Sequence, residues 1–395
     1  MSEPQQLCFV PFDTVVDTAF WHALAKRKLE DYKLLEGPFP ITAEFTSGTA
    51  PGLTPRMNVD LNSIQNPSNT SSRCSNCFRI EGSLFTLNTI DQFKELDKQS
   101  FIDNFGREQI ASVVTASTKL PDKANRLLRF LLLTYCDLKH HKFYFWFAFP
   151  SPLQQQGFQI LNRKPILEEF SQPQASTFFV TITFSILIPW PVESYCRFIY
   201  VKSVDDLILS IDMQGTETQL DNLLASYDKW REHSNDVFFS FRIGADGDVR
   251  VFSLSEFDAC QENDYLGFSD PSSDADHPGW PLRNLLFAVS STLTSSSPKA
   301  VKVLCFRDRY AHGERICSHS FVLRIQLLQK PSPSETKFVG WEKWQGKLQP
   351  RRVNLSSTMD PVKYVFNLFF TVPNKTLCLQ SWQLDMRANR EPRSH

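Results

Sequence analysis

Residues 277–309 constrain the fold most, because they join a proline-rich turn, an apolar helix and a short strand. Two prolines and a glycine within residues 277–281 prevent a helix or a strand ladder from continuing through the turn. Apolar residues then recur at helical spacing over 282–293, and Pro281 suits the first turn of a helix. The apolar run 301–306 predicts a buried strand. A helix must therefore pack against a sheet here.

The rest of the chain alternates between helical and strand periodicity. This pattern predicts an α+β fold with mixed, largely antiparallel sheets, packed helices and two subdomains. Helices are expected after an N-cap at Asp13 or Thr14, from a cap at Thr89 through residue 106, and over 123–138 and 220–230. Strands are expected over 41–45, 56–61, 79–87, 142–149, 178–188, 198–201, 207–211, 237–243, 249–254 and 318–328. The turn sequence 244–248 favours a hairpin.

Charge and cysteine usage narrow the class of protein. The net charge is −1 with 22% charged residues, which argues against a nucleic-acid binder or a polybasic membrane reader. The most apolar window, 177–192, is too short for a membrane span and contains two prolines, and the N-terminus does not resemble a secretory signal. We therefore expect a cytoplasmic chain whose nine cysteines are reduced thiols. Cys74-x-x-Cys77 has no second ligand pair at zinc-finger spacing, so no metal is expected.

Several segments resemble the N-terminal domain of the autophagy ubiquitin-like modifier-activating enzyme. They are HPGWPLRN at 277–284, VLCFRDR at 303–309, VGWEK at 339–343, VNLS at 353–356 and MDP at 359–361. Weaker similarity occurs at 20–22, 131–139 and 143–144. The resemblance covers most of residues 1–366 but departs from the family at 151–195.

The resemblance implies a domain organisation. Residues 1–329 would form the N-terminal domain, with subdomains at 1–150 and 196–329 and an atypical segment at 151–195. Residues 330–366 would be a linker leading toward the adenylation domain of the full-length family, and 367–395 a divergent tail. In the family this N-terminal domain binds conjugating enzymes, whereas the other half adenylates a ubiquitin-like modifier with ATP and holds it as a thioester.

Two groups of residues are candidates for a partner site. The family has a Phe-Ala-Pro motif before its first helix, which is implied in forming the modifier conjugates; here it reads Phe9, Val10 and Pro11. The alternative is that Phe9 and Pro11 only staple the entry to that helix. Trp280 and Arg283 are candidates for a partner surface, or else a buried turn anchor and a paired surface cation.

The chemistry of activation has no counterpart in the sequence. No GxGxxG fingerprint follows a predicted strand, no GxxxxGK[ST] occurs, and no cysteine stands in the family's catalytic context. We therefore assign no catalytic residue, cofactor or metal ligand. The expected protein is a monomer that captures a conjugating enzyme in the cytoplasm, including at pre-autophagosomal structures, and does not itself charge a modifier. Modifiers would bind only through the half that this chain does not match.

Three alternatives remain for the role of the chain. As a truncated isoform, it would compete with the full-length enzyme. A stand-alone hydrolase or transferase would need an unrecognised Ser, His and Asp site, and no GxSxG elbow is present. A fragment without an independent role is the third alternative.

Overall fold

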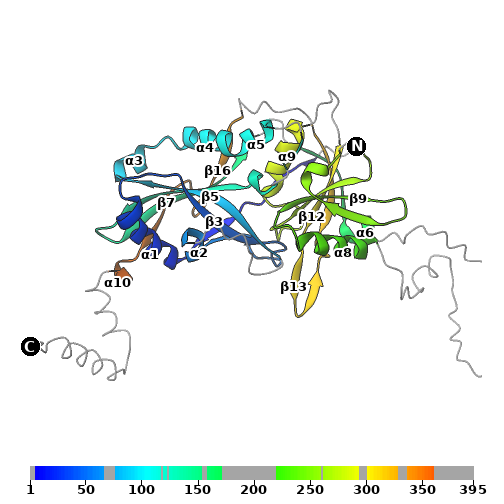
Figure 1. Ribbon diagram of the computed structural model, residues 1–395, viewed down its shortest axis with the longest axis horizontal. Coiled ribbons are helices and arrows are strands. Elements are labelled where there is room, and N and C mark those ends of the chain that lie inside the picture. The colour runs from blue at the N-terminus through cyan, green and yellow to red at the C-terminus, as the bar shows by residue number, and fades with distance from the viewer. Residues whose placement is uncertain are drawn as a thin grey trace, which may run out of the picture.

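Two β-sheets lie side by side along the long axis of the computed structural model, and helix α9 (Pro281–Thr292) lies between them (Figure 1). The structure describes residues 5–65, 76–116, 119–121, 124–153, 158–170, 219–258, 261–292, 300–327 and 336–359. The strands predicted over 178–188, 198–201 and 207–211 lie outside these residues, as do Cys74 and the predicted tail 367–395.

The larger sheet has eight strands in the order β16-β7-β6-β5-β3-β4-β2, with β17 also paired to β7. In that order the bounds are Phe338–Trp341, Lys142–Pro152, Arg129–Asp137, Cys77–Leu87, Phe39–Thr46, Arg56–Val59 and Asp13–Val16, with Arg351–Asn354 for β17.

The smaller sheet has seven strands in the order β1-β8-β15-β12-β11-β9-β10. Their bounds are Gln5–Gln6, Gln159–Pro165, Phe321–Gln326, Ala300–Phe306, Asp264–Ser269, Phe238–Ile243 and Val249–Phe252. A two-stranded hairpin, β13 (Arg309–Ala311) and β14 (Glu314–Ile316), projects from it (Figure 1). The pairs β5–β6, β2–β4 and β11–β12 are parallel, and the other described pairs are antiparallel, so the predicted α+β fold with largely antiparallel sheets is confirmed.

Helices cover both faces of the larger sheet. The α-helical segments besides α9 are α1 (Thr18–Arg27), α2 (Leu61–Gln65), α3 (Ile90–Glu95), α4 (Lys98–Gly106), α5 (Ser112–Thr115), α6 (Ile166–Phe170), α8 (Gln219–Arg231) and α10 (Ser356–Met359). Four short segments have 3-10 or π geometry: η1 (Lys28–Tyr32), η2 (Arg107–Ala111), η3 (Ala124–Leu127) and η4 (Leu254–Glu256). Figure 1 shows α3, α4 and α5 along one side of the larger sheet and α1 and α2 along the other.

The alternation of side chains along β7 explains this layering. Successive strand residues point to opposite faces. On one face, the Trp21 ring of α1 lies 5.3 Å from Phe143 and 4.9 Å from Phe145, measured between ring centroids. On the other face, Trp146 shares a buried cluster with Phe93 of α3. Side chains of helices thus pack against both faces of the larger sheet.

Helix α9 holds the two sheets together. All its residues are buried except Arg283 and Thr292, as expected for a helix that is apolar nearly all round. It connects β11 to β12 in the smaller sheet, yet its Asn284 amide donates to the carbonyls of Leu127 at 2.8 Å and Pro150 at 3.2 Å, beside the larger sheet. The Ser151 hydroxyl of β7 donates to the Asn284 carbonyl oxygen. The predicted start of this helix at Pro281 is confirmed.

The helix predicted over 123–138 is wrong. Residues Ala124–Leu127 form a single 3-10 turn, and Arg129–Asp137 form β6 in the middle of the larger sheet. Residues 130–133 of this strand are fully buried, because helices cover both faces of the sheet. A strand buried on both faces has a continuous apolar run, and over this length its spacing also fits a helix.

Two predicted helix boundaries, one start and one end, also need correction. Residues Asp13–Val16 form strand β2, and the cap of α1 is Asp17, whose carboxylate accepts from the Ala19 N–H at 3.4 Å. The predicted cap at Thr89 is confirmed, and the structure shows a capping box with Gln92, but the helix it begins ends at Glu95. A second helix, α4, starts after Asp97, whose carboxylate accepts from two backbone N–H groups of the next turn. An N-cap residue within an apolar pattern thus divides it into two helices.

The predicted linker 330–366 contains two strands of the larger sheet, β16 and β17, which both pair with β7. The loop between them reaches the opposite edge strand, β2. There the Glu342 carboxylate accepts from the Thr14 N–H at 2.8 Å, and the Arg351 guanidinium donates to the Thr14 carbonyl at 2.6 Å. Glu342 and Arg351 also pair with each other at 3.2 Å. This clasp joins the two edges of the sheet through side chains, so the sheet curves back on itself.

Replacing Glu342 by alanine should lower the free energy of unfolding by about 1.5–3 kcal/mol, because hydrogen bonds to charged groups contribute about that much. The variant would leave the Thr14 N–H and the Arg351 guanidinium without this acceptor. Urea denaturation monitored by circular dichroism measures the change, with the neighbouring exposed residue changed in Lys343→Ala as the control. Equal midpoints for the two variants would contradict the clasp.

The cysteines differ in part from the prediction. Cys8, Cys136, Cys305 and Cys317 are free thiols, but Cys77 is bonded in a disulfide, so the expectation that all cysteines are reduced is wrong for Cys77. Cys77 stands at the start of β5, and the sequence has another cysteine, Cys74, three positions before it. Within the described ranges, no helix combines the length and apolar composition needed to cross a membrane.

Candidate functional site

The N-terminal segment passes from the smaller sheet to the larger sheet beside the N-terminal end of α9. It starts as β1, paired with β8 of the smaller sheet, and the Leu7 N–H donates to the Phe158 carbonyl at 3.0 Å. After residues 9–11 it becomes β2, which pairs with β4 of the larger sheet. The motif Phe9-Val10-Pro11 therefore lies at the junction of the two sheets.

Backbone hydrogen bonds join this motif to the turn before α9. The Val10 N–H donates to the Pro278 carbonyl at 2.8 Å, and the Trp280 N–H donates to the Val10 carbonyl at 2.9 Å. Val10 and Gly279 thus form a parallel β-bridge, an extended geometry that suits a β-branched residue. The two groups of candidate residues, far apart in the sequence, are neighbours in the structure.

The side chains of the two groups also meet. The Arg283 guanidinium lies 6.0 Å from the centroid of the Phe9 ring and 5.2 Å from that of Trp280, within the range of cation–π contacts. Its Nε donates to the Pro152 carbonyl at 2.9 Å. Pro11 is exposed, and the other four residues are half-buried. We call Phe9, Val10, Pro11, Trp280 and Arg283 the junction surface.

The alternatives considered from the sequence are resolved in part. Phe9 does not staple the entry to a helix, since α1 begins only at Thr18. It is Phe12 that packs inward, with its ring centroid 5.2 Å from Phe45 and 5.4 Å from Phe149. Trp280 does anchor the turn. Arg283 is not in a salt bridge with any described residue, and burial lowers its pKa.

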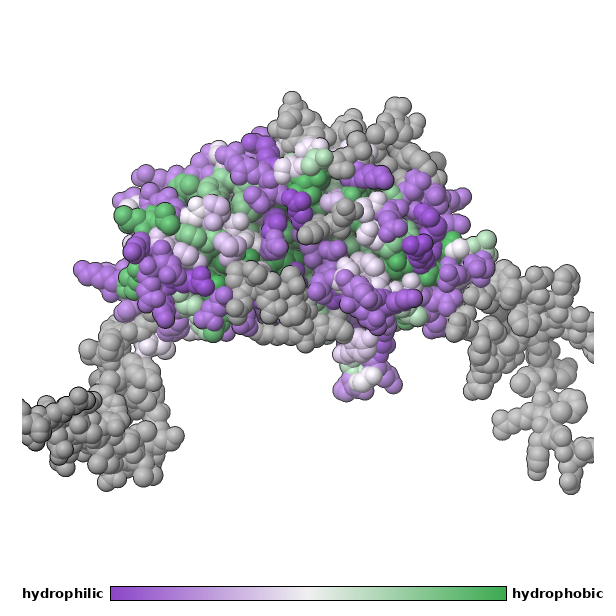
Figure 2. Space-filling model, viewed as in Figure 1, coloured by the Kyte–Doolittle hydropathy of each residue, from purple (hydrophilic) through white to green (hydrophobic). Residues whose placement is uncertain are grey.

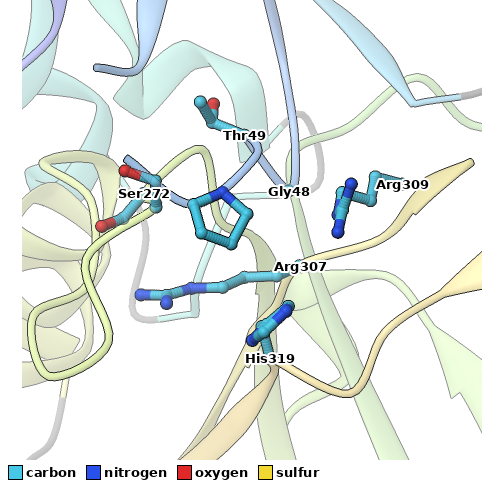
Figure 3. A pocket seen from close by; sticks show the side chains of 8 residues that line it. Gly48, Thr49, Ser272, Arg307, Arg309 and His319 are labelled. Atoms are coloured by element: carbon cyan, nitrogen blue, oxygen red, sulfur yellow. The ribbon is translucent and has the colours of Figure 1, made fainter. Parts of the chain in front are cut away.

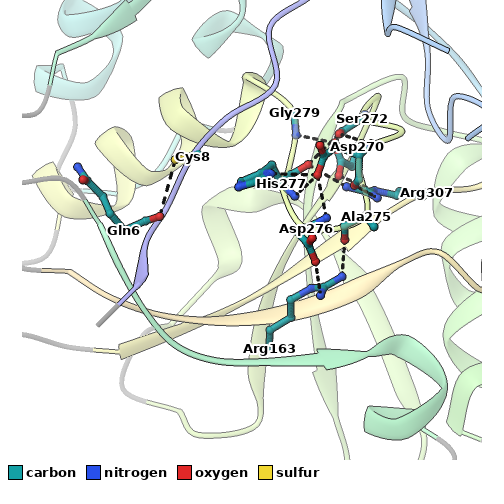
Figure 4. A network of polar contacts seen from close by, with 11 residues as sticks. Gln6, Cys8, Arg163, Asp270, Ser272, Ala275, Asp276, His277, Gly279 and Arg307 are labelled. Carbon is teal, nitrogen blue, oxygen red and sulfur yellow. Dashed lines mark hydrogen bonds and ion pairs between the residues drawn. The ribbon is translucent and has the colours of Figure 1, made fainter. Parts of the chain in front are cut away.

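A buried ion pair holds the turn that carries Trp280 (Figure 4). The Asp270 carboxylate accepts from the Arg307 Nε at 2.9 Å, from the Gly279 N–H at 2.8 Å and from the Ser272 N–H at 3.0 Å. Both charged side chains are buried. Arg307 also donates to the His277 carbonyl at 3.1 Å. One guanidinium therefore bonds both the Asp270 carboxylate and the backbone at the start of the turn. Figure 4 shows the N-terminal strand passing beside this network.

Asp270 was not identified from the sequence, and Arg307 was included only as part of the segment VLCFRDR at 303–309. The two residues are 37 positions apart, and neither belongs to a spaced motif. The signal that could have drawn attention to them was Gly279 in the turn. A Cβ atom at that position would lie 2.8 Å from the Asp270 carboxylate, so the close approach of the backbone requires glycine.

A small pocket lies behind the ion pair (Figure 3). Its volume is about 10 Å³, and its lining includes Gly48, Ser272, Arg307, Arg309 and His319. In Figure 3 Arg307 points toward Ser272, whereas Arg309 lies on the opposite side of the pocket. A cavity of this size holds about one water molecule. A nucleotide therefore does not fit here.

Two thiols of the described residues, Cys136 and Cys305, are poor nucleophiles. Burial raises the pKa of Cys136 to about 12, and burial also raises the pKa of Cys305 well above its ordinary value. A thiol attacks as its thiolate, so both are unreactive near neutral pH. In the same part of the chain, no group of three His, Cys, Asp or Glu side chains is placed to bind a metal ion.

The face of the molecule in Figure 2 carries hydrophilic and hydrophobic residues side by side. The strongly exposed leucines among the described residues include Leu29, Leu34 and Leu35, in and just after η1. They are separated in the sequence from every segment of the junction surface.

Residues 7–359 match the family described as "Ubiquitin-like modifier-activating enzyme ATG7 N-terminus". The chain belongs to this ATG7 N-terminal family. All five residues of the junction surface lie within the matched region. The resemblance inferred from short segments is therefore confirmed.

Relatives support the same family. The chain is 33% identical to the human ubiquitin-like modifier-activating enzyme ATG7 over 362 residues, which is 90% of this chain and 45% of the relative. It is 30% identical to the Rattus norvegicus ATG7 over 365 residues, 91% of this chain and 46% of the relative. The chain thus spans about half the length of the curated ATG7 proteins it matches.

Two solved structures share the fold of the ATG7 N-terminal family. The Kluyveromyces marxianus Atg7 N-terminal domain in complex with Atg10 has a TM-score of 0.56 at 19% identity and covers 90% of this chain and 100% of its own. The same domain alone has a TM-score of 0.54 at 21% identity, over 89% of this chain and 99% of its own.

Proposed function

We propose that this chain recruits a conjugating enzyme of autophagy through the junction surface. One observation carries the proposal most directly: the Kluyveromyces marxianus domain of the same fold forms a complex with Atg10. Family membership over residues 7–359 supports it. The meeting of Phe9-Val10-Pro11 with Trp280 and Arg283 gives the partner a site made from two separate segments.

A site of this kind suits recruitment better than catalysis. It offers two half-buried aromatic rings and a guanidinium, which are residue types enriched where proteins bind one another, and an exposed proline beside them. Activation of a modifier with ATP would need a nucleotide site, and the sequence carries neither of the usual phosphate-binding motifs. We infer that the 395-residue chain binds no ATP, is monomeric and acts in the cytoplasm.

The purified chain should bind Atg10 with a dissociation constant in the micromolar range or tighter, and should catalyse no ATP–pyrophosphate exchange in the presence of a ubiquitin-like modifier. Isothermal titration calorimetry measures the first quantity and a radiolabel exchange assay the second. Phe9→Ala and Trp280→Ala should each weaken binding at least tenfold, because aromatic anchors contribute about 2 kcal/mol or more where they are central to an interface.

Val10→Ala serves as the matched control. It restores the residue of the family's Phe-Ala-Pro motif, and both hydrogen bonds of Val10 come from its backbone, so binding should change less than threefold. Unchanged affinity for Atg10 in Phe9→Ala and Trp280→Ala would argue against the junction surface. Exchange activity in the unmodified chain would contradict the assignment as a recruiting domain.

A further inference from the structure

The Arg283 guanidinium uses only part of its hydrogen-bonding capacity. A guanidinium has five N–H donors, and the Arg283 Nε–H donates to the Pro152 carbonyl at 2.9 Å. No hydrogen bond from its two terminal nitrogens to a described residue is found. The rings of Phe9 and Trp280 flank the group, at 6.0 and 5.2 Å. The terminal nitrogens therefore have donors to offer to a partner.

The charge of Arg283 is also uncompensated within the described residues. Two other half-buried arginines among the described residues do have counter-ions: Arg315 pairs with Asp308 at 2.8 Å, and Arg351 pairs with Glu342 at 3.2 Å. Around Arg283, burial alone lowers the pKa, and no neighbouring carboxylate opposes it. A half-buried cation without a counter-ion costs free energy unless something else neutralises it.

A second donor at the same place lacks a partner. The Trp280 indole Nε1 is buried and makes no hydrogen bond to a described residue. Indole nitrogen is a donor only, and a buried donor left unpaired is destabilising. Two unsatisfied donors, one of them charged, thus belong to neighbouring side chains of the junction surface.

We propose that Arg283 receives the carboxylate of an aspartate or glutamate from the recruited conjugating enzyme. This inference rests on the proposed function, and it names the chemistry that the junction surface recognises. A carboxylate matches the planar fork of a guanidinium through two parallel hydrogen bonds. The flanking rings keep water away from the pair and so strengthen it. A phosphoryl group would need further donors, which the ring faces of Phe9 and Trp280 do not supply.

The test is a calorimetric titration of Atg10 into the full chain and into Arg283→Gln, Arg283→Lys and Arg324→Gln. Arg324 is an exposed arginine on β15 and controls for the general loss of a positive charge. We expect Arg283→Gln to weaken binding at least tenfold and Arg283→Lys to recover only part of that loss, since an ammonium lacks the fork. Arg324→Gln should stay within twofold.

The partner side gives an independent arm of the test. Each aspartate and glutamate of Atg10 is changed to its amide and titrated against the unmodified chain. One of these variants should reproduce the loss seen with Arg283→Gln and should add no further loss when combined with it. The titrations of the partner variants against the unmodified chain do not depend on whether Arg283→Gln folds as well as that chain.

The outcomes separate the two proposals. If Phe9→Ala weakens binding but neither Arg283→Gln nor any partner carboxylate does, the carboxylate inference is overturned and recruitment stands. If the carboxylate losses are additive with Arg283→Gln, the inference is also overturned. If the unmodified chain does not bind Atg10, the proposed function fails, and this inference fails with it.

Discussion

Replacing Asp270 by alanine should lower the free energy of unfolding by about 3–5 kcal/mol, because it leaves a buried guanidinium without its counter-ion. Arg307 is 3% exposed and Asp270 is fully buried, so neither charge is screened by water. The change also removes the acceptor of the Gly279 and Ser272 N–H groups. Urea denaturation with linear extrapolation measures the loss.

Two controls make this prediction specific. Asp276→Ala removes a carboxylate that pairs with Arg163 at the surface, where its side chain is 66% exposed, and should cost less than about 1 kcal/mol. The double variant Asp270→Ala/Arg307→Ala should lose less than the sum of the single losses, because it leaves no unpaired charge. Additive losses in the double variant would contradict the ion pair as the source of the effect.

The Asp270→Ala variant should also bind Atg10 more weakly. Without Asp270 the Gly279 N–H has no acceptor, so the turn is less well fixed. Pro278 and Trp280, which form backbone hydrogen bonds with Val10, then become less well positioned. Affinity for Atg10 should therefore fall at a temperature where the variant is still folded. Asp276→Ala should bind as the unmodified chain does.

Replacing Asn284 by leucine should lower the free energy of unfolding by about 2–4 kcal/mol, although leucine has a similar volume. The variant leaves the carbonyls of Leu127 and Pro150 without the amide that donates to them inside the core, and each unsatisfied group costs about 1–3 kcal/mol. Ser290→Ala on the same helix is the control. It removes a bond to the Leu286 carbonyl, a local helix bond whose loss should cost less than about 1 kcal/mol.

Asn284→Leu should also change how the molecule unfolds. Asn284 attaches the crossover helix of the smaller sheet to the larger sheet, so its loss weakens the coupling between them. Tryptophan fluorescence, to which Trp21 packed on β7 and Trp146 of β7 contribute, and far-ultraviolet circular dichroism should then give transitions that no longer coincide. Coincident transitions together with an unchanged midpoint would contradict this role.

Local sequence signals located α9 well, because a proline starts the helix and its apolar residues recur at helical spacing. The same method failed at β6. There, residues 130–133 are buried on both faces, and the apolar run is decided by the helices packed on either side. It also failed at β2, since Asp13 looks like a cap until its pairing with β4 is known. Local signals thus failed where tertiary contacts decided the structure.

The candidate site could be named but not assembled from the sequence. Phe9 and Trp280 stood out through a resemblance and an unusual turn, yet nothing in the sequence showed that Val10 pairs with Gly279. Asp270 lies in the polar run Ser269-Asp-Pro-Ser-Ser273, which reads as a solvated turn. Its burial depends on Arg307, which arrives from a different strand. Long-range partners of this kind carry no local signal.

Hydrogen–deuterium exchange on the complex with Atg10 tests the central claim most directly, because it locates the partner without changing any residue. The account predicts that backbone amides of residues 7–12 and 278–284 gain protection when Atg10 is added, whereas those of β10, at the far edge of the smaller sheet, do not. Protection confined to β10 and α8, with residues 7–12 and 278–284 unchanged, would show that recruitment uses another surface.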